Sequence, residues 1–104
     1  MNTILIDKNW HLEIGNTNII LSKNGVNIIE KINDYYDLIK SLSEYINESE
    51  APRCIKIHNT ENKATAVIRK KDFKRFYEFM MESKAKVDKI YYQQSKTIEL
   101  EFNN

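Results

Sequence analysis

Residues 10–29, WHLEIGNTNIILSKNGVNII, decide the fold class of this chain. The large apolar side chains of Trp10, Leu12 and Ile14 occupy every second position of this stretch. Because successive side chains of a strand point to opposite faces, this spacing predicts a strand with one buried face. A shorter strand is expected upstream at residues 4–6, where apolar residues also alternate. The chain is therefore expected to open with a sheet.

The Asn24-Gly25 pair predicts a hairpin between two further strands, at residues 19–22 and 26–29. A two-residue type I′ turn needs positive φ at both central positions, and asparagine and glycine tolerate that conformation best. The return strand is therefore expected to run antiparallel to the strand before the turn.

From residue 34 onward the apolar side chains follow the spacing of amphipathic helices. Residues 34–48 and 72–85 each carry an apolar stripe at intervals of three and four residues, which predicts two helices. Alternating residues at 54–58 and 64–69 predict two strands between the helices. Residues 87–93 and 97–102 then predict a closing hairpin. The two helical stripes consist of Tyr35, Leu38, Ile39, Leu42, Tyr45 and Ile46, and of Phe73, Phe76, Tyr77 and Met80.

This order of strands, helix, two strands, helix and two strands predicts an α+β fold. Short links between the strands favour a mostly antiparallel sheet, and two amphipathic helices on one face of it would complete a two-layer domain. The 104 residues are enough for one hydrophobic core without disulfide or metal support, so residues 1–104 are expected to form a single domain.

Composition excludes several classes of protein. The chain has two glycines, too few for the glycine-rich loops that bind phosphates or dinucleotides. It has no apolar run long enough to span a membrane, and its single cysteine, Cys54, agrees with a reducing compartment, so a cytoplasmic location is expected. Isoleucine, lysine and asparagine account for 40 of the 104 residues, a bias typical of AT-rich bacteria and their phages.

No arrangement of residues in the sequence predicts catalysis, and neither a cofactor nor a metal is expected. Cys54 and His58 lie on one expected strand, roughly 13 Å apart, which is too far for a thiol–imidazole pair. Together with His11 they also lack the tight spacing of a zinc site. Asp34 and Asp37 are explained by the start of the first helix, where negative charge is favourable. We therefore expect a protein that is not an enzyme.

One candidate binding site is a basic segment around the start of the second helix. Positive charge opposes the helix dipole at this end, which leaves two interpretations: an ordinary solvated surface, or a site for phosphate groups or a partner's carboxylates. The segment consists of Arg69, Lys70, Lys71, Lys74 and Arg75.

The second candidate is an apolar patch on the sheet face away from the helices. Leu5, Ile20 and Ile29 alternate with the inward residues, and Tyr92 of the closing hairpin is expected to join them. If the helices cover only the other face, this patch needs a different cover. It predicts a homodimer or partner interface, unless the sheet curls or the closing hairpin covers it.

Residues 4–10 (ILIDKNW), followed by a hairpin and by residues 35–38 (YYDL), resemble small accessory proteins of phages from AT-rich hosts. In size and single-domain organisation the chain is also similar to anti-CRISPR and other anti-defence proteins. The resemblance implies a non-enzymatic inhibitor that occupies a functional surface of a host effector protein in the bacterial cytoplasm. Two alternatives stay open: a nucleic-acid or nucleotide-binding protein that uses the basic segment, and an immunity protein to a toxin.

Overall fold

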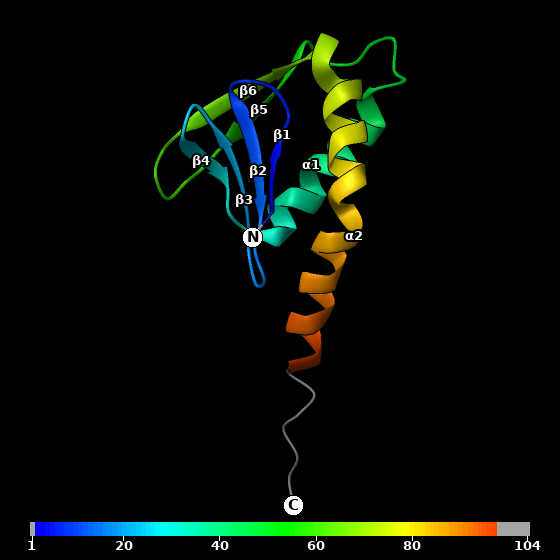
Figure 1. Ribbon diagram of the computed structural model, residues 1–104. Helices are drawn as coiled ribbons and strands as arrows, with labels where there is room; N and C mark the ends of the chain where they lie inside the picture. The colour runs from blue at the N-terminus through cyan, green and yellow to red at the C-terminus, as the bar shows by residue number, and fades with distance from the viewer. Residues whose placement is uncertain (1, 98–104) are drawn as a thin grey trace, which may run out of the picture.

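The computed structural model describes the backbone of residues 2–97 and the side chains of residues 6–93 (Figure 1). The chain runs through four strands, a helix, two strands, a short 3-10 turn and a long second helix. The predicted α+β fold with two helices and antiparallel strands is confirmed. The second strand of the expected closing hairpin, residues 97–102, falls almost entirely outside the described residues.

The first four strands form one antiparallel sheet, in which every strand lies beside its neighbours in sequence. They are β1 (Asn2–Leu5), β2 (Trp10–Ile14), β3 (Ile19–Lys23) and β4 (Val26–Ile29). Between β3 and β4, Asn24 and Gly25 have φ values of 53° and 80°, the positive values that the turn was expected to need.

A bulge in β4 changes the direction of its apolar residues. Leu21 pairs with Ile29 and the next residue of β3, Ser22, pairs with Asn27, so Ile28 is an extra residue on β4. The bulge breaks the alternation of faces, and both Ile28 and Ile29 are buried in the core. The expectation that Ile29 lies on the outer face was therefore wrong.

Helix α1 (Ile32–Tyr45) begins two residues earlier and ends three residues earlier than the sequence pattern indicated. Tyr35, Leu38, Ile39 and Leu42 of the expected stripe are buried, whereas Tyr45 and Ile46 are half-buried. The helix packs against the second helix of the chain. At this contact the hydroxyl of Tyr35 donates a buried hydrogen bond to the carbonyl of Met80.

Strands β5 (Cys54–His58) and β6 (Thr65–Arg69) form a hairpin of their own. The expectation of a single sheet was wrong in this respect, because no strand of this hairpin is hydrogen-bonded to the four-stranded sheet within residues 2–97. Ala66 and Ile68 of β6 are buried, whereas Ile55 and Ile57 of β5 are only half-buried. Strand β5 is therefore the more exposed strand of the pair.

Helix α2 (Phe73–Thr97) follows directly from the 3-10 turn η1 (Lys70–Asp72) and is much longer than expected. Residues 87–93, expected as a strand, continue the helix. Val87 and Ile90 lie on the same stripe as Met80 and are buried, so the period of the helix extends past its expected end.

Both helices lie on the same side of the four-stranded sheet, as predicted (Figure 1). Trp10 of β2 and Phe76 of α2 meet edge to face, with ring centroids 5.0 Å apart, and this contact joins the sheet to the helical layer. Within the described residues, neither helix is long and apolar enough to cross a membrane.

Candidate functional site

The basic segment lies where β6 leads through η1 into α2, and all five of its side chains are exposed. Two of the five already have partners. The Arg75 guanidinium lies 3.2 Å from a carboxylate oxygen of Asp7 and 3.3 Å from one of Asp72, and the Lys70 ammonium donates to the carbonyl of Ser49 at 3.5 Å. These two residues therefore tie α2 and η1 to neighbouring loops.

The carboxylate of Asp7, which contacts Arg75, also stabilises a turn of the backbone. It accepts hydrogen bonds from the backbone N–H groups of Asn9 and Trp10, at 2.7 and 3.0 Å, and so shapes the turn between β1 and β2. Partial burial acts to raise the pKa of Asp7, but these hydrogen bonds and the charge of Arg75 outweigh it and hold the pKa below its usual value.

Three cations of the segment, Arg69, Lys71 and Lys74, have no hydrogen-bond or ion-pair partner among the residues that the structure describes. They lie close together in sequence, at the end of β6, in η1 and in the first turn of α2. The basic surface available to a ligand is therefore these three residues.

The expected apolar patch on the outer sheet face is not assembled as predicted. Ile29 is buried by the bulge, and Tyr92 lies on α2, where it is 62% exposed. Ile20 is half-buried on the outer face of β3 opposite Glu13. Leu5 pairs with His11 at the edge of the sheet, and its side chain lies outside the described ones. Ile29 and Tyr92 therefore do not share a surface with Ile20.

Tyr92 belongs instead to a row of aromatic rings on the helical layer. The ring of Tyr91 lies edge to face with those of Tyr92 and Tyr36. The Tyr36 hydroxyl donates to the carboxylate of Asp88, and this hydrogen bond, with the nearby Lys84 ammonium at 3.0 Å, lowers the pKa of Asp88. The row fastens the two helices together near the start of α1.

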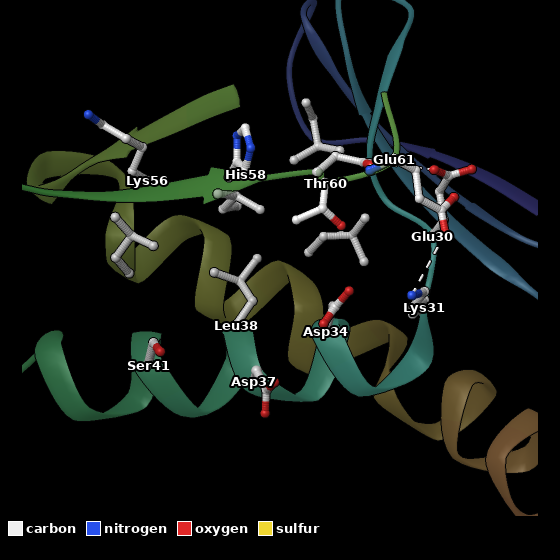
Figure 2. Close-up of a pocket in the computed structure, with 15 residues that line it drawn as sticks. Glu30, Lys31, Asp34, Asp37, Leu38, Ser41, Lys56, His58, Thr60 and Glu61 are labelled. Atoms are coloured by element: carbon white, nitrogen blue, oxygen red, sulfur yellow. Dashed lines mark hydrogen bonds and ion pairs between the residues drawn. The ribbon is translucent and has the colours of Figure 1, made fainter. Parts of the chain in front are cut away.

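A cleft of about 400 Å³ lies between α1 and β5, and we call it the α1–β5 cleft (Figure 2). The segment that links β4 to α1 and the turn that links β5 to β6 close one end of it. Its lining residues are Ile28, Ile29, Glu30, Lys31, Asp34, Asp37, Leu38, Ser41, Ile55, Lys56, Ile57, His58, Asn59, Thr60 and Glu61.

The floor of the cleft is apolar and its mouth is acidic. Five isoleucine and leucine residues line it, and Leu38 points from α1 toward β5 in Figure 2. Four carboxylates and two lysines are among the lining residues, and one of these carboxylates, Asp37, points away from β5 in Figure 2. Asp34 and Asp37 have no hydrogen-bond or ion-pair partner within the described part of the chain, so their charges are available to a ligand.

Asn59 holds the closed end of the cleft together. Its amide nitrogen donates to the carbonyl of Asn27 at 3.3 Å and to the carboxylate of Glu30 at 3.0 Å. Its carbonyl oxygen accepts the backbone N–H groups of Glu61 and Asn62, at 2.9 and 3.2 Å. One buried side chain therefore joins β4 to the β5–β6 turn, although the two belong to different sheets.

Sequence reasoning missed this cleft. It explained Asp34 and Asp37 by the start of a helix, and no periodic pattern shows that β5 packs over α1. Cys54 and His58 are both exposed on β5, and the His58 ring hydrogen-bonds to the Thr65 hydroxyl at 2.8 Å. No group of three or more histidine, cysteine, aspartate or glutamate residues suited to a metal ion occurs in the described residues.

An open cleft with an apolar floor, unpaired carboxylates and a strand along one wall is suited to binding an extended chain segment. Comparisons with protein-family models, with curated proteins and with solved structures found no match.

Proposed function

We propose that this protein binds another protein through the α1–β5 cleft and thereby blocks a functional surface of that partner, without a chemical reaction of its own. The observation that carries the proposal is the cleft, which combines half-buried apolar side chains with two unpaired carboxylates. Apolar area supplies binding energy, and unpaired charge at the rim selects the partner and its orientation.

The sequence resemblance to anti-defence proteins suggests the kind of partner, a defence effector of the bacterial host. A CRISPR effector is the most specific form of this proposal. Inhibition by a small domain requires only that the bound domain cover a surface that the effector needs. A 104-residue protein can cover about 800 Å² on its partner, the usual size of one side of a stable interface.

The cleft is tested by filling it. Ser41 is half-buried and lines the cleft (Figure 2), so Ser41→Trp would place a large side chain in the space of the ligand. We expect Ser41→Trp to weaken binding to a purified CRISPR effector at least about tenfold, which corresponds to about 1.4 kcal/mol. Isothermal calorimetry across a panel of purified defence effectors would measure the affinity.

The matched control is Ser43→Trp, on the same helix but exposed and outside the cleft. It should bind like the wild type. Equal binding by Ser41→Trp and the wild type would exclude the cleft as the partner surface, and no binding by any effector of the panel would contradict the inhibitor proposal.

A second candidate function is nucleic-acid binding, which the three unpartnered cations Arg69, Lys71 and Lys74 favour. Each phosphate neutralised contributes a slope of about −0.7 to −0.9 to the plot of log affinity against log salt concentration. Because Lys70 and Arg75 are engaged elsewhere, we expect a slope of roughly −2 to −3 if this function is real, rather than the roughly −3.5 to −4.5 of five contacts.

Fluorescence anisotropy with duplex and single-stranded DNA would measure this slope. The double variant Lys71→Glu, Lys74→Glu should abolish such binding, whereas Lys40→Glu, an exposed residue of α1, should change it little. Micromolar or tighter binding at physiological salt that the double variant abolishes would support the second candidate over the first.

A further inference from the structure

We propose that the α1–β5 cleft receives an extended segment of the partner that adds to β5 as a third strand, with apolar residues facing α1 and a lysine or arginine beside Asp34. This inference rests on the proposed function and specifies how the partner is held. Strand addition to an exposed sheet edge is a general mode of peptide recognition, in which backbone hydrogen bonds give affinity and side-chain pockets give specificity.

The register of the hairpin shows which backbone groups of β5 are free. Beyond the two ends of the β5–β6 ladder, the N–H of Lys70 donates to the carbonyl of Arg53, and the N–H of Asn59 donates to the carbonyl of Ala64. In an antiparallel pair, hydrogen-bonded and non-hydrogen-bonded residue pairs alternate. Ile55 and Ile57, which have the same parity as Arg53 and Asn59, therefore direct their backbone groups toward β6.

Cys54, Lys56 and His58 consequently direct their N–H and carbonyl groups away from β6. None of these groups has a partner in the described residues, and β5 has no second neighbouring strand there. Unpaired edges of this kind are templates for another strand. Five residues of β5 offer roughly 16 Å of edge, enough for a partner segment of about five residues.

The two sides of β5 differ, and the difference defines the side chains of the occupant. The side chains of Lys56 and His58 point away from α1 in Figure 2, so by alternation Ile55 and Ile57 face α1. A third strand would share this alternation. Every second side chain of the segment would therefore enter the apolar cleft above Leu38, and the others would face solvent.

The charge of the cleft mouth selects a basic segment. Asp34 lies on the first turn of α1, toward the His58 end of β5, and its side chain points toward the β5 side in Figure 2, whereas that of Asp37 points away from β5; neither is neutralised by a described residue. A second copy of this chain is a poorer occupant. Two β5 strands paired antiparallel about their centres would place Lys56 opposite Lys56, and like charges directly opposite each other destabilise a strand pair.

A phage-displayed library of random heptapeptides, panned against the full-length protein, is the probe. We expect the enriched peptides to alternate apolar and polar residues and to carry lysine or arginine. Affinity of the synthesised consensus peptide should fall at least tenfold for Lys56→Pro, which removes an edge N–H and obstructs the approach of a strand. The Lys56→Pro variant should still fold, because proline is tolerated on an edge strand. Lys56→Ala is the control, because it keeps the backbone N–H donor.

N-methylation of the peptide provides a second test on the unmodified protein. Two methylated peptides are compared, one with methyl groups on the odd-numbered amides and one with them on the even-numbered amides. The peptide whose methylated amides face β5 should not bind, and the affinity of the other should stay within about threefold of the unmethylated peptide. Asp34→Asn should weaken binding of the basic peptide and shift the enriched peptides toward neutral ones, whereas Asp37→Asn should have the smaller effect.

The outcomes separate this inference from the proposed function. In one outcome, Ser41→Trp loses effector binding, but peptide binding tolerates Lys56→Pro and both phases of N-methylation. This outcome would overturn strand addition and leave the cleft as the partner surface. Peptide binding that depends on the edge, with no effector bound, would support strand addition and overturn the inhibitor proposal. A protein dimer at tens of micromolar that Lys56→Pro dissociates would overturn the inference in favour of a second copy.

Discussion

Phe76→Ala is expected to reduce the free energy of unfolding by about 3–5 kcal/mol, the usual range for deletion of a buried phenylalanine ring. Phe76 is 1% exposed, and its ring is the direct contact between α2 and Trp10 of the sheet. Deletion of the ring loses its apolar burial and the edge-to-face contact, and it leaves a cavity between the two layers.

Chemical denaturation followed by circular dichroism would measure the effect of Phe76→Ala. Lys74→Ala is the control on the same helix, because Lys74 is exposed and its replacement should change stability by less than about 0.5 kcal/mol. A loss below about 1 kcal/mol for Phe76→Ala would show that the helical layer does not pack on the sheet through this residue.

Asn59→Ala is expected to reduce the free energy of unfolding by about 2–4 kcal/mol. The change removes four hydrogen bonds, one of them to the carboxylate of Glu30, and each contributes about 0.5–1.5 kcal/mol net or somewhat more when a charge is involved. The loss should concentrate on the β5–β6 hairpin, whose turn Asn59 attaches to β4.

Hydrogen exchange of the β5 and β6 amides would locate this effect, and denaturation would measure its size. Asn62→Ala is the matched control. Asn62 lies in the same turn and also donates to the carbonyl of Asn27, but it is exposed, so we expect a loss of no more than about 1 kcal/mol. Equal losses for both variants would contradict a special role of the buried amide.

The two candidate surfaces of the molecule differ in how far the sequence could indicate them. The basic segment is contiguous in sequence, so its exposure could be predicted, but the ion pair of Arg75 with Asp7 could not. Asp7 lies 68 residues away from Arg75, and no local pattern links them. The α1–β5 cleft is lined by residues of β4, α1 and β5, so no single stretch of sequence carries a signal for it.

Local sequence determined those strands and helices in which the spacing of the buried apolar residues and the backbone preference of the residues favour the same structure. The alternation at Trp10, Leu12 and Ile14 and the Asn24-Gly25 turn correctly predicted the antiparallel strands. The stripe of α1 correctly predicted which side of that helix is buried. In these segments the period of the apolar residues and the intrinsic backbone preference favour the same structure, so no tertiary contact was needed to choose between alternatives.

Tertiary structure decided the rest. Residues 87–93 contain β-favouring valine, isoleucine and tyrosine, yet they are helical, because the burial of Val87 and Ile90 is worth roughly 1.5–3 kcal/mol each, whereas β-propensity differences span only about 1 kcal/mol. The separation of β5 and β6 into a second sheet was also decided by tertiary structure, because a strand's own pattern does not specify which neighbour covers it.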